Sequence, residues 1–303
     1  MSSPINTGDF LKALWPGVNA WYGKGYNDWK TQYEPMYDTF RSELPYEEDV
    51  GISSFPLAKI KTQGDGIQYA SERQGFVTRY THVEYALGFM VTRIMMEDNQ
   101  YDAVVARRAP DLARSMRQTK ETVAANVYNR AFNNDYVGGD GKELCANDHP
   151  NVAGGTWSNV LTTPADLSEA ALEQACIDIM GFTDDAGLKI QVQPKTLIIS
   201  KDQVFEAERI LMSPYRVGTS NNDVNALYNM GKFKNIHVNQ YLTDPDAWFI
   251  RNDVPHGMKH FIRRDDDFQM DNDFDTENAK YKATARYAFG WTNPRDLFGS
   301  PGA

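Results

Sequence analysis

Cysteine is nearly absent from the sequence, since Cys145 and Cys176 are the only two among 303 residues. Two cysteines are too few for a disulfide framework, so we expect a reducing compartment. Long apolar runs are also missing, because no stretch approaches the roughly 18 residues that a membrane span needs. The opening residues, MSSPINTGDFLKALWPG, lack the basic region and apolar stretch of a secretory signal. We therefore expect no membrane association and no secretory route.

Positive charge is in deficit as well. The chain holds 31 lysines and arginines against 41 aspartates and glutamates, which gives a net charge of −10. Broad capture of nucleic acid needs clustered basic residues that neutralise phosphates, so tight DNA binding is not expected. Hydrophobic residues at 41% and charged residues at 24% are close to globular averages. The composition predicts a folded protein with one large or two ordinary domains.

Sequence motifs for catalysis are absent too. The chain has no Gly-x-x-x-x-Gly-Lys-Ser/Thr loop, no Gly-x-Gly-x-x-Gly opening a βαβ unit and no Gly-x-Ser-x-Gly elbow. Cys176 lies in a predicted helix, where we expect it to face the core rather than to act as a nucleophile. We therefore predict neither a catalytic residue nor a cofactor-binding site.

Two groups of residues invite a metal-binding interpretation. The acidic run RRDDDFQMDNDFDTEN can be aligned with a calcium loop from Asp271, but Thr276 and Lys282 stand where that loop requires Gly and Glu. We predict a solvated turn between strands there instead. Cys145 and His149, with histidines elsewhere, lack the paired spacing of a closed zinc site. No metal site is predicted, although a metal-dependent enzyme using the acidic run and the histidines stays an alternative.

Residues 66–95 show the pattern of extended chain. Side chains alternate with a period of two in the middle of this stretch, yet charged residues interrupt both faces. Upstream, residues 56–70 supply a shorter strand-like piece and the turn signal GDG. Together they predict a long β-hairpin, which is marginal in water by itself. We expect a neighbouring molecule to complete it.

The flanking regions carry helical signals. The first 50 residues are rich in aromatic side chains, with short helices predicted near residues 8–14 and 27–42. An amphipathic helix of about 24 residues is predicted to begin at Pro110, a residue suited to the first helical turn. The Gly- and Asn-rich stretch after it predicts surface turns and a small hairpin.

The rest of the chain mixes helices and strands. A helix from Leu167 to Phe182, the strand PKTLIIS, the helix KDQVFEAERIL and strands in KNIHVNQYL and DAWFIRND predict a compact α+β unit. GMKHFIRR and AKYKATARYAFGW predict two further strands. In the second of these, Tyr, Ala and Phe face one way, and Lys, Thr and Arg face the other.

This order of parts resembles the major capsid proteins of tailed bacteriophages, whose shared fold is named after the lambdoid Hong Kong phage. Three stretches carry the likeness: FVTRYTHVEYALGFMVTRIMMEDNQYDAVVARRAPDLARSMRQTKETVAANVYN, LEQACIDIMGFTDDAGLKIQVQPKTLIISKDQVFEAERILMSP and ARYAFGWTNPRDLFGSPGA. The first is similar to the family's extended loop and spine helix, and the second to its axial domain. The third is similar to the last strand and tail in capsid proteins of Mu-like, contractile-tailed phages.

The resemblance implies an α+β fold with four parts. Residues 1–50 would form an N-terminal arm, and residues 51–95 an extended β-hairpin loop that reaches across a neighbouring subunit. Residues 96–160 and 255–303 would form a peripheral domain with a long spine helix. Residues 161–254 would form the axial domain around the centres of hexamers and pentamers.

The same resemblance implies a structural protein, not an enzyme, that self-assembles into an icosahedral shell around a double-stranded DNA genome. It would be assembled in the host cytoplasm and become part of the virion, without a cofactor and without binding the packaged DNA tightly. A portal protein and a separate scaffold protein are expected partners, the latter because only about 50 residues precede the hairpin. A cement or decoration protein is a further partner. An encapsulin-like shell that stores enzymes is an alternative of the same fold.

Six residues are candidates for contacts between subunits. Arg73 and Arg79, near the hairpin's tip, would be charged anchors across such a contact, or else solubilising gatekeepers on an exposed edge. The other candidates are aromatic residues of the hairpin and the leading arm: Tyr69, Phe76, Trp21 and Trp29. Lys59 and Lys61 also lie in the hairpin, but a lysine there is more often solvated, so covalent cross-linking is not predicted.

Overall fold

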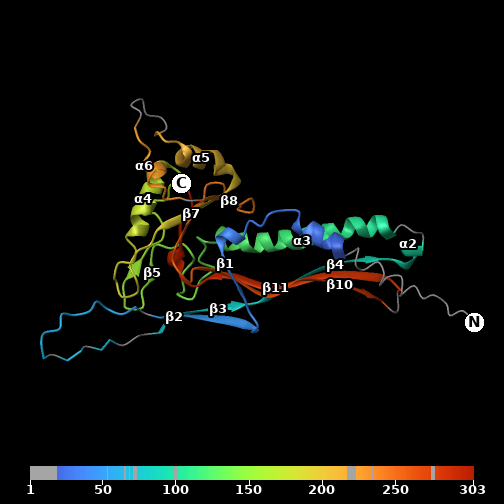
Figure 1. Ribbon diagram of the computed structural model, residues 1–303, viewed down its shortest axis with the longest axis horizontal. Helices are drawn as coiled ribbons and strands as arrows, with labels where there is room; N and C mark the ends of the chain where they lie inside the picture. The colour runs from blue at the N-terminus through green and yellow to red at the C-terminus, as the bar shows by residue number, and fades with distance from the viewer. Residues whose placement is uncertain are drawn as a thin grey trace, which may run out of the picture.

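The computed structural model describes residues 19–52, 54–64, 66–67, 69–70, 74–97, 101–216, 223–233, 235–273 and 277–303. Within these ranges the chain is built around two four-stranded sheets. A long helix lies along the first sheet, and the second sheet stands with its helices at one end of that assembly (Figure 1). A loop projects from the same end.

The first sheet has the strand order β1-β10-β11-β4. Its strands are β1 (Asp38–Arg41), β10 (Met258–Asn272), β11 (Ala279–Trp291) and β4 (Val83–Val91). β1 runs parallel to β10, whereas β11 is antiparallel to both of its neighbours. The predicted alternation of β11 is confirmed, because tyrosines and alanines along it are buried whereas Lys280 and Lys282 are exposed.

The prediction of a solvated turn over the acidic run is wrong for most of its length, because β10 continues to Asn272. Asp271 in this part of the strand lies opposite Lys280 of β11. Opposite charges on facing residues of neighbouring strands favour the pairing. The partner strand therefore makes extended structure favourable for acidic residues that, by themselves, have a low β propensity.

The long helix α3 (Tyr101–Asn129) follows the short helix α2 (Arg93–Glu97) and covers one face of the first sheet (Figure 1). Its 29 residues correspond to about 44 Å at 1.5 Å per residue. The predicted start at Pro110 is wrong, because Pro110 lies inside the helix. A second helix, residues 19–27, packs against this point, where a Cβ on Gly25 would come within 2.5 Å of the Pro110 Cα. The two helices therefore approach so closely at Pro110 that position 25 has no room for a side chain.

The leading segment, residues 19–37, contains this second helix and the 3-10 turn η1 (Glu34–Met36). The helix predicted over residues 27–42 is wrong, because that range ends in β1. Pairing of β1 with β10 gives its backbone hydrogen-bond partners, and such tertiary contacts override weak local propensity. The helix predicted near residues 8–14 lies outside the described residues.

Polar side chains of α3 hold the leading segment in place. Arg117 donates to the backbone carbonyls of Tyr26 and Trp29, each at 3.0 Å. The carboxylate of Glu121 accepts from the backbone N–H of Gln32 at 2.9 Å. Both side chains of α3 are buried, and burial raises the pKa of Glu121 above its ordinary value.

The second sheet has the strand order β12-β9-β7-β8. Its strands are β12 (Leu297–Ser300), β9 (Trp248–Asn252), β7 (Pro194–Ile199) and β8 (Asn235–Val238). It packs with α4 (Glu169–Met180), η2 (Lys201–Gln203), α5 (Val204–Met212) and α6 (Ala226–Met230). The helices and strands predicted for this unit are confirmed, and Cys176 of α4 is buried as predicted.

The C-terminal residues connect the two sheets. After β11 the chain makes the 3-10 turn η3 (Pro294–Asp296), and β12 then joins the second sheet beside β9. The small hairpin predicted among the surface turns before residue 160 is confirmed, because β5 (His149–Pro150) pairs antiparallel with β6 (Thr156–Trp157).

Candidate functional site

The hairpin predicted from the sequence exists, but with a different first strand. β2 (Tyr46–Ile52) pairs antiparallel with β3 (Gln74–Thr81). The strand predicted within residues 56–70 is wrong, because the described residues of that stretch have no strand structure. β2 was missed because Glu47, Glu48 and Asp49 give it a low β propensity.

The base of this hairpin is fixed to the first sheet by polar contacts. The buried hydroxyl of Tyr80 lies 2.6 Å from that of Thr292, which donates to the carboxylate of Asp49 at 2.7 Å. The amine of Lys259, from β10, donates to the same carboxylate. Burial alone would raise the pKa of Asp49, but the hydrogen bonds from Lys259 and Thr292 outweigh it and lower that pKa.

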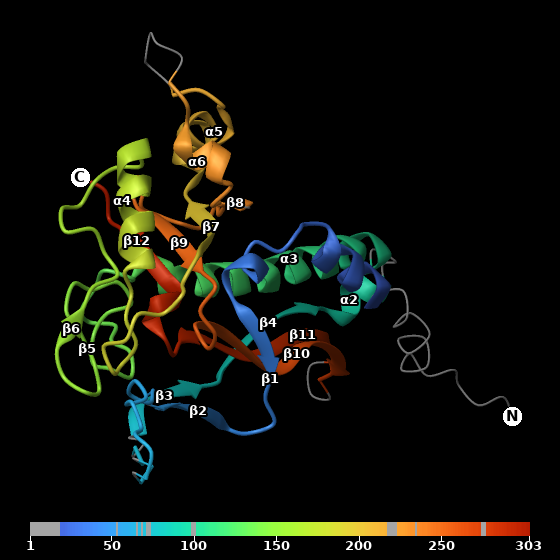
Figure 2. The same ribbon diagram turned by 60° about the vertical axis from the view of Figure 1, so that its left-hand side comes forward.

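The residues between β2 and β3 form a loop that leaves the body of the molecule. The projecting loop is visible in Figure 1 and, from a second direction, in Figure 2. Every described residue from 54 to 70 is exposed. Among them are five large apolar or aromatic side chains, with Ile60 at 96% exposure and Tyr69 at 92%: Phe55, Leu57, Ile60, Ile67 and Tyr69.

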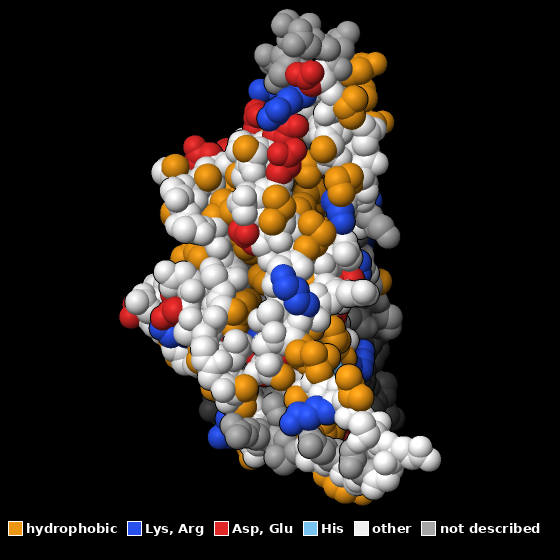
Figure 3. Space-filling view, turned by 90° about the vertical axis from the view of Figure 1, so that its left-hand side faces the viewer, with side chains coloured by type: hydrophobic (Ala, Val, Ile, Leu, Met, Phe, Trp, Pro, Cys, Tyr) orange, Lys and Arg blue, Asp and Glu red, His pale blue; other side chains and the backbone are white. Residues whose placement is uncertain are grey.

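Exposed apolar side chains gathered on a projecting element indicate a contact surface. Monomeric proteins rarely leave contiguous apolar patches open to water. In Figure 3, hydrophobic side chains are visible near both ends of the face from which the loop projects. Toward the second sheet, α5 and α6 also leave large side chains exposed: Phe205, Met212, Tyr228 and Met230.

The predicted contact residues lie in different surroundings. Tyr69 belongs to the projecting loop, and Phe76 is an exposed residue of β3. Arg79 contacts its own hairpin, with its guanidinium 3.7 Å from the ring centre of Tyr46 and 4.0 Å from the carboxylate of Glu48. This ion pair is exposed and therefore weak.

The remaining three candidates lie elsewhere or outside the described residues. Trp21 packs partly buried against the core between α3 and the first sheet. Trp29 is half exposed. Arg73 lies outside the described residues. The contacts of all six residues with another subunit stay a prediction.

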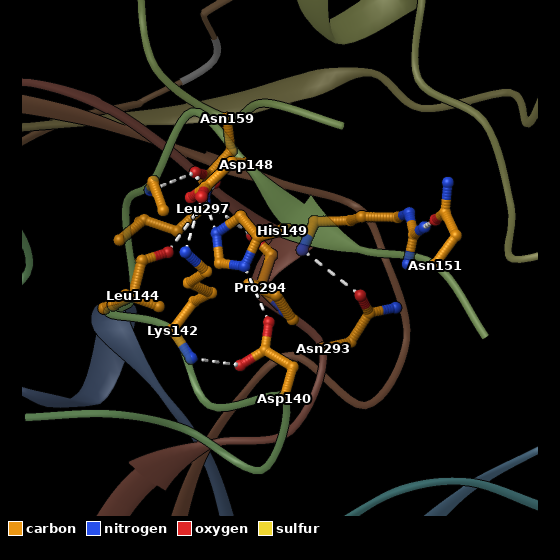
Figure 4. A network of polar contacts seen from close by, with 12 residues as sticks. Asp140, Lys142, Leu144, Asp148, His149, Asn151, Asn159, Asn293, Pro294 and Leu297 are labelled. Atoms are coloured by element: carbon orange, nitrogen blue, oxygen red, sulfur yellow. Dashed lines mark hydrogen bonds and ion pairs between the residues drawn. The ribbon is translucent and has the colours of Figure 1, made fainter. Parts of the chain in front are cut away.

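A polar network beside the hairpin base holds the 138–159 region against the C-terminal segment (Figure 4). The Asn159 amide donates to the carbonyl oxygens of Leu144, Pro294 and Leu297 at 2.8–3.2 Å. Its oxygen accepts from the backbone N–H of Ala146 at 2.9 Å. Asn159 is fully buried. Its side chain therefore provides hydrogen-bond partners, out of reach of water, for backbone groups of segments that are far apart in the sequence. Sequence patterns gave no signal for this role.

The residues considered as metal ligands have other partners here. His149 is buried, with Nδ1 2.7 Å from Asp140 and Nε2 3.2 Å from Asn159. Burial raises the pKa of the Cys145 thiol, which opposes the thiolate form that binds metals. Burial also lowers the pKa of His260 to about 3. Among the residues that the structure describes, no three His, Cys, Asp or Glu side chains are grouped to hold a metal ion.

A cleft of about 510 Å³ separates the hairpin base from the 140–157 region and the C-terminal segment. One group of lining residues is apolar or aromatic: Val50, Phe76, Pro150, Trp157, Pro255 and Pro294. The charged lining residues are three carboxylates and one guanidinium: Asp49, Asp140, Asp185 and Arg295.

The part of the chain that the structure describes contains no helix with the length and apolar character to span a bilayer.

A family model described as phage capsid protein matches residues 75–298, more than half of the chain. The fold is similar to the procapsid of bacteriophage JBD30 at 11% identity and a TM-score of 0.53, covering 98% of this chain and 76% of that one. It is similar to the capsid of a native GTA particle at 12% identity and a TM-score of 0.53, covering 91% and 92%. A virus-like particle from Pyrococcus furiosus gives 13% identity and a TM-score of 0.51, covering 93% and 97%. No curated protein sequence matches the chain.

Proposed function

Because the chain belongs to the phage capsid protein family, we propose that it assembles as hexamers and pentamers into an icosahedral head that encloses double-stranded DNA. The chain is a shell-forming major capsid protein, a structural component of the virion, and it associates with copies of itself. The observation that carries the proposal is the loop between β2 and β3, whose exposed apolar residues need a neighbouring copy to cover them.

Assembly by such loops relies on many modest contacts. Each subunit would give its loop to one neighbour and receive a loop from another, so that ring closure makes individually weak contacts strong. The domain division that we propose has an arm over residues 1–50, a hairpin loop over 51–95, a peripheral domain over 96–160 and 255–303, and an axial domain over 161–254. The two separate four-stranded sheets support it.

The proposed partners follow from the same role. A portal protein, a separate scaffold protein and a cement or decoration protein would complete the head, and assembly would take place in the host cytoplasm. The net charge of −10 supports a shell that encloses DNA without gripping it tightly. Within the family we propose membership of the Mu-like, contractile-tailed group, on the likeness of the C-terminal stretch.

The experiment is a replacement of residues 54–72 by an Asn-Gly turn that joins β2 directly to β3. Since the described residues of this loop are exposed, the subunit should keep its fold and its thermal midpoint. It should no longer form closed shells in electron micrographs, under conditions where the wild type does. A control loop of Gly and Ser with the original length should fail equally, because it lacks the apolar side chains. Normal shells from either variant would refute the proposed role of the loop.

A further inference from the structure

We propose that two copies of this chain pair through the free edge of β4, antiparallel and about a two-fold axis at Leu87, so that their first sheets become one continuous sheet. The inference rests on the proposed function, because the partner is another copy of the same chain. It goes further by naming a contact that does not involve the loop between β2 and β3, and by fixing the symmetry and the register of that contact.

An open strand edge is the feature behind this contact. β4 lies at one end of the first sheet, and β11 is its only strand partner among the residues that the structure describes. Its other edge therefore presents backbone N–H and C=O groups with no strand beside them. The side chains are open to water as well, since Val91 is the only buried residue of β4. Val83, Leu87 and Met90 are all about half exposed, so a partner strand would also remove apolar surface from water.

The two edges of this sheet differ in their protection against pairing. β1, at the opposite end, has four residues and carries a charge at each end, on Asp38 and Arg41. Short and charged edge strands are a usual protection against pairing with another chain. β4 has nine residues in continuous register with β11, and it contains no lysine, arginine or proline. Its single charge, on Glu84, is paired with Arg264 of the same subunit. β4 therefore lacks the protection that β1 has.

The sequence of β4 is complementary to itself. A two-fold axis perpendicular to the sheet keeps every side chain on its own face, and with the axis at Leu87 all nine residues of β4 find a partner. Tyr85 then lies opposite Phe89 of the second copy, and aromatic pairs in this position stabilise a sheet. Glu84 lies opposite Met90 of the second copy, so no like charges meet. This self-complementarity identifies the partner strand as β4 of another copy.

The aromatic side chains of β4 are held in place before any pairing. Tyr85 stacks on Tyr287, and Phe89 stacks on Tyr281, each with ring centres 4.8 Å apart. These rings belong to the core between α3 and the first sheet, and by alternation Leu87 lies between them on the same face. An ordered strand edge loses little conformational freedom on pairing, which favours affinity. The two-fold axis would place α3 of both copies on the same face of the joined sheet.

A cross-linking experiment tests the register. Purified shells of Leu87→Cys are treated with a short bis-methanethiosulfonate linker, and dimers are measured on a non-reducing denaturing gel. Both native cysteines are buried, so the introduced thiols react first. Directly opposite residues of paired strands have Cβ atoms about 5 Å apart, so we expect most subunits to be cross-linked. Met90→Cys, on the same strand and similarly exposed, is the control, because in this register its two copies are about 20 Å apart and should give at least about tenfold less dimer. Shells assembled from a mixture of Glu84→Cys and Met90→Cys should give the dimer again.

A charge-swap experiment tests the two-fold symmetry without cysteines. Leu87→Lys and Leu87→Glu each place two like charges opposite each other and lose the burial of Leu87, so each should raise the critical concentration for assembly about tenfold or more. An equal mixture of the two variants can place opposite charges together, and its critical concentration should be about threefold or more below that of either variant alone. Leu87 is about half exposed in the subunit, so both variants should keep the thermal midpoint of the wild type.

The outcomes separate this inference from the proposed function. Equal cross-linking of Leu87→Cys and Met90→Cys would overturn the pairing of β4 while shells still depend on the loop. So would a mixture of the two charged variants that assembles no better than either variant alone. If the charged variants lose thermal stability, the cross-linking comparison decides by itself. A wild-type chain that forms no shells would overturn the proposed function, and the pairing of β4 with it.

Discussion

Shortening the side chain of Ile60 in steps, to Val, Ala and Asp, measures how much apolar contact the loop makes in the assembled shell. Ile60 is 96% exposed in the subunit and lies in a stretch without secondary structure. Replacing it should therefore change the free energy of unfolding of the unassembled subunit by less than about 0.5 kcal/mol. A larger effect on assembly then reports a contact with another copy.

The expected magnitudes follow from the carbon atoms removed. Burying one methylene contributes about 0.8 kcal/mol, so Ile60→Val should weaken each loop contact about fourfold. Ile60→Ala removes three carbons and should weaken each contact by about 2.4 kcal/mol, or about sixtyfold. Ile60→Asp also adds a negative charge to a chain that already carries −10, and it should prevent closed shells.

The assay is the critical concentration for shell formation, followed by light scattering and checked by electron microscopy. Thermal unfolding of the unassembled subunits is measured in parallel. The reasoning fails if the three variants share the wild-type critical concentration. It also fails if the variants lose thermal stability in step with their loss of assembly, since that would place Ile60 within the subunit's own packing.

Two further predictions concern stability of the unassembled subunit. Burial raises the pKa of Asp296 to about 6 despite the nearby Arg251, against about 3.9 in the unfolded chain. Between these two pKa values the folded state keeps a proton that the unfolded state has lost, so the free energy of unfolding should fall by up to about 3 kcal/mol as pH rises from about 4 to 6. Urea unfolding at several pH values measures this fall, and Asp296→Asn should make it smaller. An unchanged dependence of the free energy of unfolding on pH in that variant would contradict the prediction. Asn159→Ala should lower the free energy of unfolding by about 3–5 kcal/mol, because several buried backbone groups lose their hydrogen-bond partner. The control Ser158→Ala should lower it by less than about 1 kcal/mol. Equal losses in the two variants would refute the role given to Asn159.

Elements whose burial follows a regular period could be predicted from the sequence. β11 alternates tyrosine and alanine with lysine, and the structure buries one set and exposes the other. α4 has one apolar face and a Ser168 cap, whose hydroxyl accepts from the N–H of Ala171 at 3.2 Å. In these elements local pattern and tertiary packing agree, so the pattern is sufficient.

The features that could not be predicted depend on partners far away in the sequence. Three consecutive acidic residues give β2 a low β propensity, so the sequence pattern does not predict it as a strand. Asp49 is stabilised there by hydrogen bonds from Lys259 and Thr292, which lie near the other end of the chain. Asn159 bonds to carbonyls 135 and 138 residues further on. For the candidate site, the sequence predicts an incomplete hairpin but not the cleft, because the cleft forms between segments that only the fold brings together.

The ties between α3 and the leading segment have an evolutionary consequence. Arg117 and Glu121 bond to main-chain groups of Tyr26, Trp29 and Gln32, and every residue type except proline offers the same main-chain donor and acceptor. Selection acting through these bonds constrains Arg117 and Glu121 rather than the residues whose main chain they bind, and packing constrains the side chains of the segment separately, as it does for Trp21. An anchor that needs only main-chain groups is compatible with a fold that this chain shares with proteins at 11–13% identity.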